Sequence, residues 1–304
     1  MTVNYQYIET NILFITVGSP LSINFIETIY EENVRGVIKL RNEIYIICRS
    51  KVIRVYEDRI PFRFQKEIEV QESSYLIDIV SSEKEMCLYI SDSWGKCVWK
   101  IAREFDGQHK VINWMTTEYE PWTLSVSSDG QLLVVSASSS LLMIYGSDAA
   151  LCRSIQLPTD IRDPFHAVET SIGSFIILHQ WVEKEEDTET TLCGRTIWVV
   201  SELCRDGQTV TRRFIPRDGT QQLNDPKYLS LDSDDQVFVA DQRNSRVILL
   251  DSDLTWNQII CPTKEEQETI IGRPYRLCYD KEKKQLLVGG YLGKGINVYR
   301  LSQK

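Results

Sequence analysis

The chain contains no long hydrophobic segment. Its apolar runs, such as Ile12–Val17, are far too short to span a bilayer. The first residues also lack the basic segment followed by an apolar stretch that marks a secretory signal peptide. The sequence therefore predicts a cytoplasmic protein without a membrane partner.

Histidine is scarce and the cysteines are scattered. Only three histidines occur in 304 residues, and the eight cysteines form no CxxC pair. A zinc site needs clustered His or Cys, so this composition argues against one. The chain also has no phosphate-binding loop, nucleophile elbow or Ser-His-Asp order. We therefore expect buried free thiols in a reducing compartment, no cofactor, no metal and no catalytic residue.

Positive charge is in deficit as well. Lys and Arg number 34 against 43 Asp and Glu, which gives a formal net charge of −9. This balance opposes broad nonspecific binding to nucleic acid or to an anionic membrane, although a local basic patch can still exist. A composition that is 42% hydrophobic and 25% charged fits a globular protein with a substantial core. We expect a monomer.

What the sequence does contain is a repeat, which is clearest in Leu223–Asp251. An alternating strand, Tyr228–Leu231, is followed by a turn, a continuous apolar strand, Val237–Ala240, a polar hairpin and a third strand, Val247–Leu250. Asp241 marks the end of the second strand, and a proline stands fifteen positions earlier. Three strands cannot bury both of their faces alone, so copies are expected elsewhere in the chain.

Equivalent marks recur through the chain, at Cys48, Asp92, Ser136, His179, Asp241 and Gly290. Their spacing is in the forties except for 62 residues between His179 and Asp241. There the acidic segment Glu183–Thr191 lengthens one hairpin, and we interpret it as a solvated flap rather than a recognition loop. A period in the forties with three strands in each unit matches a β-propeller blade. The sequence thus predicts an all-β fold, a six-bladed β-propeller.

We predict one domain over residues 1–304. Its blades should span about residues 33–70, 73–114, 120–158, 163–214, 223–261 and 272–301. The last unit ends without an outer strand, whereas residues 1–32 hold two spare strand-like segments, Ile12–Val17 and Ile23–Tyr30. An N-terminal strand, for which we favour Ile23–Tyr30, should complete the sixth blade and remove its open edge.

The best-preserved unit resembles the NHL repeat. It has Pro226 before an alternating strand, then Val237–Asp241, then Asn244 and Arg246. The second unit keeps Asp92, but Ser136 and Gly290 replace the aspartate in two others. The resemblance implies a six-bladed propeller like those that end the tripartite-motif (TRIM-NHL) proteins, which bind proteins or RNA. The chain has no RING finger, B-box or coiled coil, so ubiquitin-ligase activity is not implied.

The strand order should place the second-to-third and fourth-to-first connections on one face, which we call the binding face. Exposed Trp, Tyr and Arg are the residue types that anchor binding surfaces. The alternative for Asp92 and Asp241 is that they bond the backbone of their own turns. Some of the aromatic rings must also pack between blades. The candidates for this face are Arg49, Asp92, Trp94, Trp122, His166, His179, Trp181, Lys227, Asp241, Arg243, Asn244, Tyr275, Arg276, Tyr291 and Lys294.

The leading hypothesis is a non-catalytic interaction module that binds a protein or peptide over this face. The first alternative is single-stranded RNA, because basic groups interleaved with aromatic rings can hold phosphates and stack bases. The second is a metal-dependent hydrolase or lyase at the ring centre, with His166 and His179, or Asp92, Asp241 and Asn244, as ligands. The basic residues for RNA are Arg49, Lys51, Lys96, Lys227, Arg243, Arg246, Arg273, Arg276 and Lys294, beside Trp94 and Tyr291.

Overall fold

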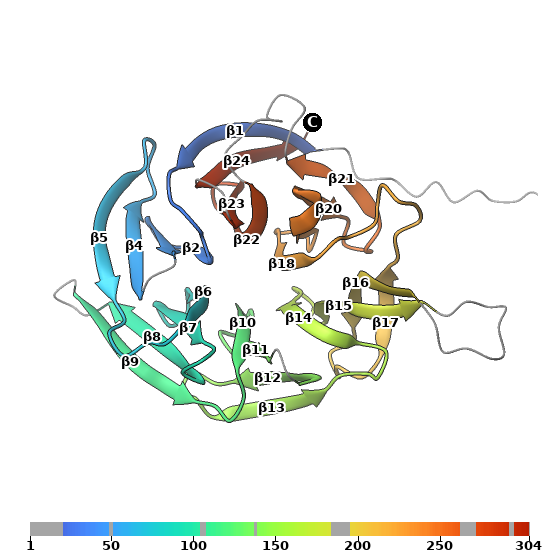
Figure 1. The fold of residues 1–304 in the computed structure, drawn as a ribbon, viewed down its shortest axis with the longest axis horizontal. Helices are drawn as coiled ribbons and strands as arrows, with labels where there is room; N and C mark the ends of the chain where they lie inside the picture. Colours follow the sequence, from blue (N-terminus) through green and yellow to red (C-terminus); the bar gives the residue numbers. More distant parts are fainter. Residues whose placement is uncertain are drawn as a thin grey trace, which may run out of the picture.

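Six antiparallel sheets surround a central axis in a computed structural model of the chain (Figure 1). It describes residues 21–48, 51–103, 108–136, 139–183, 195–261, 272–291 and 295–303. Each sheet has four strands, which follow one another in order from the axis to the rim. The predicted six-bladed β-propeller is confirmed.

The first five blades follow the chain directly. The first two consist of β2 (Gly36–Leu40), β3 (Glu43–Ile47), β4 (Val52–Glu57), β5 (Arg63–Glu69), β6 (Leu76–Ser82), β7 (Cys87–Asp92), β8 (Cys97–Arg103) and β9 (His109–Thr116). The third and fourth consist of β10 (Pro121–Val126), β11 (Leu132–Ser136), β12 (Leu141–Tyr145), β13 (Leu151–Gln156), β14 (Arg162–Glu169), β15 (Phe175–Glu183), β16 (Arg195–Leu203) and β17 (Val210–Phe214). The fifth consists of β18 (Pro226–Leu231), β19 (Val237–Asp241), β20 (Arg246–Leu250) and β21 (Trp256–Cys261).

The sixth blade closes the ring. It contains β22 (Arg273–Asp280), β23 (Gln285–Tyr291) and β24 (Ile296–Gln303), and β1 (Leu21–Ile29) is its outer strand. β1 pairs antiparallel with β24 from one end to the other, with one bulge between Phe25 and Glu27. The N-terminal strand therefore completes the last blade, as the sequence predicted. Of the two predicted segments, Ile23–Tyr30 overlaps β1, and Ile12–Val17 lies outside the described residues.

A buried charge cluster joins the last blade to the first. The Lys39 amine contacts the Asp280 carboxylate of the sixth blade and lies 3.2 Å from Asp58 in its own blade. Asp58 in turn receives Lys283 at 2.7 Å. Both aspartates are less than a tenth exposed. The seam of the ring is thus held by charges from both blades as well as by the β1–β24 ladder.

The core lies between the blades, which explains the apolar runs. Every residue of β7 and β19 is buried, because both faces of a middle strand pack against a neighbouring blade. One cluster joins Phe238 and Leu249 of the fifth blade to Leu277, Leu286 and Tyr299 of the sixth. The outer strand β5 is instead mostly exposed, as expected for a sheet edge, and Ile68 is its one buried residue.

Two local features differ from a plain meander. β15 and β16 have nine residues each and extend one hairpin, and most of the predicted acidic flap lies outside the described residues. Between β19 and β20 the predicted hairpin tip is a single 3-10 turn, η1 (Gln242–Asn244). It is the one helical element of the described ranges, and no helix within them is long and apolar enough to cross a membrane.

Removing β1 tests ring closure. We expect deletion of residues 1–30 to lower the melting temperature by about 10 °C or more, because it strips the ladder from β24 and leaves an open edge. Circular dichroism melts and light scattering measure the loss and the aggregation that follows. Deletion of residues 1–20 is the matched control and should leave the transition intact. Equal transitions for the two deletions would contradict the closure argument.

Candidate functional site

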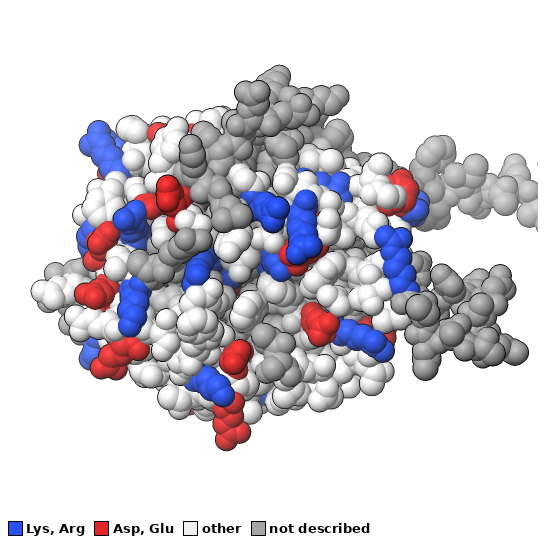
Figure 2. All heavy atoms as spheres, in the orientation of Figure 1, with Lys and Arg blue, Asp and Glu red and all other residues white. Residues whose placement is uncertain are grey.

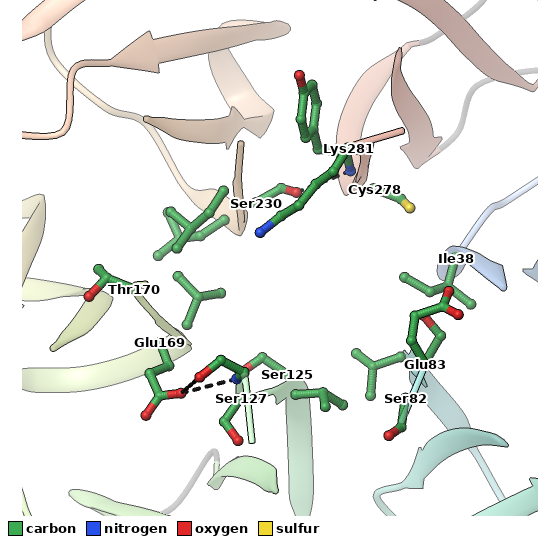
Figure 3. Close-up of a pocket in the computed structure, with 18 of the residues that line it drawn as sticks. Ile38, Ser82, Glu83, Ser125, Ser127, Glu169, Thr170, Ser230, Cys278 and Lys281 are labelled. Atoms are coloured by element: carbon green, nitrogen blue, oxygen red, sulfur yellow. Dashed lines mark hydrogen bonds between the residues drawn. The ribbon is translucent and has the colours of Figure 1, made fainter. Parts of the chain in front are cut away.

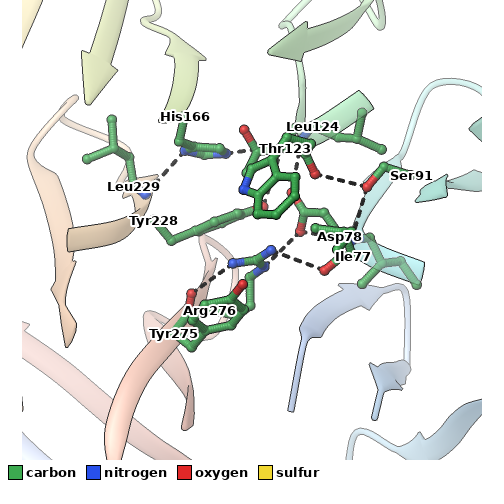
Figure 4. Close-up of polar contacts among 12 residues, drawn as sticks. Ile77, Asp78, Ser91, Thr123, Leu124, His166, Tyr228, Leu229, Tyr275 and Arg276 are labelled. Carbon is green, nitrogen blue, oxygen red and sulfur yellow. Dashed lines mark hydrogen bonds and ion pairs between the residues drawn. The ribbon is translucent and has the colours of Figure 1, made fainter. Parts of the chain in front are cut away.

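One layer of side chains fills the middle of the ring. In each blade one residue of the innermost strand pairs with the second-strand residue that directly precedes the repeat mark. These residues, which we call the axial layer, are Gly36, Asp78, Thr123, His166, Tyr228 and Arg276. All five side chains are buried, and Figure 4 shows them converging from their separate blades.

An ion pair crosses the axial layer. The Arg276 Nε donates to Asp78 Oδ1 at 3.1 Å, and a second guanidinium nitrogen donates to the Ile77 carbonyl at 3.1 Å. Arg276 thereby reaches from the sixth blade to the second, past the first blade, where Gly36 has no side chain. Asp78 Oδ2 also accepts the Leu124 backbone N–H of the third blade at 2.9 Å. One charged pair therefore ties three blades together.

The surroundings of this pair fit its charged form. Burial is the largest single influence and disfavours a charged guanidinium, but Asp78, Tyr275 and Tyr228 together outweigh it and raise the pKa of Arg276. Burial is also the largest influence on Asp78, and it raises the pKa of that carboxyl although Arg276 and the backbone N–H donors lower it. However, the two Asp78 oxygens accept N–H donors from Arg276, Ile79 and Leu124, which a carboxylate satisfies and a protonated acid does not.

His166 and Tyr228 fill the other half of the layer. Their rings stack with centroids 3.9 Å apart. His166 Nδ1 accepts the Leu229 N–H at 3.2 Å, so Nε2 carries the proton and donates to the Leu124 carbonyl at 3.1 Å. Burial lowers the pKa of His166 to about 3. The imidazole is therefore a neutral part of a closed channel.

The axial layer separates two mouths. Figure 3 shows the mouth on the side of the first-to-second-strand turns, a cavity of about 510 Å³ that we call the lower mouth. Serine and threonine hydroxyls line it, with Lys281 extending across and Glu83 on the far wall. The upper mouth, of about 300 Å³, opens on the binding face. Its lining residues are Arg35, Tyr75, Ile77, Trp122, Asp225, Lys227, Gln242, Arg243, Arg273, Tyr275 and Tyr291.

Aromatic rings form the walls of the upper mouth. Trp94 stacks on Tyr75 with centroids 4.5 Å apart, and its side chain is 69% exposed. The Arg35 guanidinium lies 4.0 Å from the centre of the same Tyr75 ring. Tyr275 and Tyr291 form a second pair at 5.4 Å. The mouth thus presents flat rings in contact with cations.

Positive charge exceeds negative charge in the upper mouth. Arg35, Lys227, Arg243 and Arg273 line it together with a single acid, Asp225. That carboxylate receives Lys227 at 2.5 Å and Arg243 at 3.3 Å. Figure 2 shows Lys and Arg side chains gathered over the middle of this face, whereas acidic and basic groups alternate toward the rim.

Two buried aspartates position the mouth. Asp92 accepts the backbone N–H groups of Ser74 at 2.6 Å and Tyr75 at 2.8 Å, and so holds the Tyr75 backbone. Asp241 accepts the Asn224 N–H at 2.7 Å, directly before Asp225. Asp92 also accepts the Gly95 N–H and the Trp99 indole N–H, and Asp241 accepts the Asn244 amide and the Arg246 guanidinium. The alternative that each aspartate bonds the backbone of its own turn therefore holds only for Asp92 with Gly95, because the other backbone donors belong to the preceding fourth-to-first connections.

The structure divides the predicted face residues into several groups. Trp122, Lys227, Arg243, Tyr275 and Tyr291 line the upper mouth, and Trp94 lies against its wall. Asn244 donates to Asp241 and to the Gln222 carbonyl, and Trp181 lies beside Arg213 in the fourth blade. Arg49 and Lys294 are outside the described residues.

The expectation of an exposed position is wrong for five residues. Asp92, His166, His179, Asp241 and Arg276 are at most 1% exposed. Their polar atoms bond the backbone or cross the axis, which a buried polar group requires.

The sequence interpretation missed Arg35, Tyr75, Asp225 and Gln242 as site residues. The register offers a signal for Arg35, because the residue directly before each axial residue lines the upper mouth in five of the six blades. These residues are Arg35, Ile77, Trp122, Lys227 and Tyr275.

The donors weighed for metal binding do not fit a metal. His179 Nδ1 donates to the Gln180 carbonyl at 2.7 Å, and its Nε2 accepts the Ser201 hydroxyl at 2.7 Å. Both nitrogens of His166 are likewise occupied by backbone groups. Asp92 and Asp241 lie in different blades, and each already accepts several donors. Across the described ranges no three His, Cys, Asp or Glu side chains are grouped as metal ligands would be.

Comparison with known proteins identifies the fold. No protein-family model and no curated protein sequence matches the chain, so the NHL resemblance is not confirmed. Virginiamycin B lyase from Staphylococcus aureus is similar in structure, with TM-score 0.57 and 9% identity over 93% of this chain and 89% of that one. The WD40 propeller domain of Doa1 gives TM-score 0.60 and 11% identity over 93% and 97% of the two chains.

An enzyme of a second type is also among the similar structures. The gluconolactonase XC5397 from Xanthomonas campestris has TM-score 0.60 and 12% identity over 90% of this chain and 89% of that one. Two enzymes and a WD40 domain thus share the architecture at about a tenth identity. The likeness establishes the propeller fold and leaves enzymatic status undetermined.

Acid should weaken the fold through its buried histidines. The pKa of His166 is lowered by burial to about 3 and that of His179 to about 4, against about 6.5 unfolded. The unfolded chain therefore binds more protons below pH 6.5, and stability falls as the pH falls. Between pH 7 and pH 5 each histidine should remove about 2 kcal/mol from the unfolding free energy. Urea titrations of wild type and His166→Gln test this, since the variant should lose about half of the histidine-dependent slope. Parallel slopes would contradict it.

Removing one partner of the axial ion pair should lower the unfolding free energy strongly, whereas replacing both partners should lower it much less. Arg276→Met leaves Asp78 charged and buried without its partner, and we expect a loss of about 3 to 5 kcal/mol in unfolding free energy. Asp78→Asn combined with Arg276→Met should recover most of that loss, because no buried charge remains. Denaturant titration of the two variants provides the measurement. A double variant no more stable than Arg276→Met would contradict the assigned pairing.

Proposed function

We propose that this protein is a non-catalytic interaction module that binds a protein or peptide over the binding face, centred on the upper mouth. The observation that carries the proposal is the joint lining of that mouth by four cations and by the rings of Tyr75, Trp122, Tyr275 and Tyr291. Aromatic and guanidinium groups around a recess are the residue types that dominate binding energy at protein interfaces.

The chemistry of the polar groups favours binding over catalysis. A general acid or base needs an accessible titratable group with a suitable pKa. The two histidines of the fourth blade are buried, neutral and fully hydrogen bonded. The buried carboxylates of Asp78, Asp92 and Asp241 accept donors that hold the scaffold. In the lower mouth, Glu169 accepts from Ser128 and Asp235 from Ser171, so these acids also serve local structure.

A peptide display library tests which face binds. We expect selection against the full chain to enrich peptides whose affinity falls at least about tenfold in Trp94→Ala, because an exposed ring on the mouth wall is an interface anchor. Fluorescence anisotropy with the enriched peptide measures the change.

The matched control is Ile172→Ala. Ile172 is 76% exposed, similar to Trp94 at 69%, but it lies in a first-to-second-strand turn on the opposite face. This variant should bind as wild type does. If the peptide is lost in Ile172→Ala and retained in Trp94→Ala, the binding face is the wrong one.

A further inference from the structure

We infer that the partner is recognised through an acidic side chain, an Asp or Glu carboxylate that enters the upper mouth. This inference rests on the proposed function. The juxtaposition behind this inference is four cations around one recess in a chain whose formal net charge is −9. In such a chain a local excess of positive charge is unusual, and it attracts and orients an anionic ligand.

The cations of the upper mouth are unequally neutralised. Asp225 is the single acid in the lining, and it serves both Lys227 and Arg243. Arg35 rests on the Tyr75 ring and donates to the Leu76 carbonyl. Within the described part of the chain, Arg35 and Arg273 form no ion pair with a carboxylate. The mouth therefore holds more positive charge than its own acid neutralises.

A residue of the same lining carries a further donor. Trp122 lines the upper mouth, and its indole nitrogen is buried with no acceptor among the described residues. A buried N–H without a partner is unfavourable, and an incoming oxygen relieves that cost. A carboxylate offers several acceptor positions, so it can receive a guanidinium and an indole N–H together.

Size and charge layout favour a carboxylate side chain over an RNA strand. A cavity of about 300 Å³ accommodates one side chain, whereas a nucleic-acid strand needs a basic track along its phosphates. On the face in Figure 2 the basic groups gather at the centre, and acids interrupt them toward the rim. The flat rings of Tyr275 and Tyr291 complete a recess suited to the apolar stem of Glu.

Charge-reversal variants of the protein and of the selected peptide test the acidic contact. We expect enriched peptides to contain Asp or Glu, and replacing that residue by Gln to weaken binding about tenfold, because a charge-assisted bond is lost. Arg243→Glu and Arg273→Glu should each weaken the acidic peptide about tenfold. The peptide with Lys in place of its acid should bind Arg273→Glu more tightly than it binds wild type, which a merely structural role of Arg273 would not produce.

Lys281→Glu is the matched control for charge. It makes the same change in the lower mouth, on the opposite face, and should alter affinity less than about twofold. Unchanged melting temperatures for the three variants show that folding is intact. Affinity should also fall as salt rises from low to physiological concentration, because the contacts are charged.

The outcomes separate the inference from the proposed function. Neutral enriched peptides that need Trp94 but bind Arg243→Glu and Arg273→Glu as tightly as wild type would overturn the acidic ligand and keep the binding face. A random single-stranded RNA pool that displaces the peptide, binds more tightly and is lost in the same two variants would overturn the acidic ligand in favour of RNA. A library without any binder that depends on Trp94 would overturn both.

Discussion

Six inner strands meet at one axis, and whatever side chains they present there must pack and satisfy each other. This protein meets the constraint with a buried ion pair, a stacked His166–Tyr228 pair, a threonine and a glycine. The Asp78–Arg276 pair is the central interaction, because each partner contacts groups from more than one blade. A buried pair of this kind adds little net stability, but each charge strongly requires its partner. It therefore links the inner strands of the sixth, second and third blades.

The axial pair and the seam of the ring depend on each other. Arg276 belongs to the last blade and Asp78 to the second, so the pair spans the seam between the last and first blades. β1 on β24 and the Lys39–Asp58–Asp280 cluster provide that joint. In return, a guanidinium that bridges past Gly36 holds the inner strands across the seam. Closure at the rim and closure at the axis are two parts of one cooperative arrangement.

The sequence predicted the fold because the repeat is carried by local signals. A continuous apolar run, a turn and an alternating strand recur at a regular spacing, and each signal is read within about fifteen residues. The site was less predictable. Arg276 and Asp78 are 198 positions apart, and no local pattern announces their pairing. A charged side chain near a strand start also reads as exposed, since Arg is rarely buried.

A shift of one residue separates scaffold from site. Arg276 lies in the axial layer, whereas Tyr275, directly before it, lines the upper mouth. In the same way His166 is buried, whereas the ring of Phe165, directly before it, contacts Lys227 of the next blade. The sequence alone gave no reason to choose between adjacent positions. The sequence nevertheless predicted one shared face for Trp122, Lys227, Arg243, Tyr275 and Tyr291, which all line the upper mouth, because the strand order determines the face.

The same adjacency couples the upper mouth to the buried axial layer. Five of its lining residues directly precede axial residues, so the buried layer holds their backbone in place. Asp92 fixes the connection that carries Tyr75, and Asp241 fixes the one that carries Asp225. A recess whose walls are already ordered loses little conformational entropy on binding, and more of the contact energy appears as affinity. The polar layer that closes the channel thus has a second consequence, since its residues also position the backbone that lines the upper mouth.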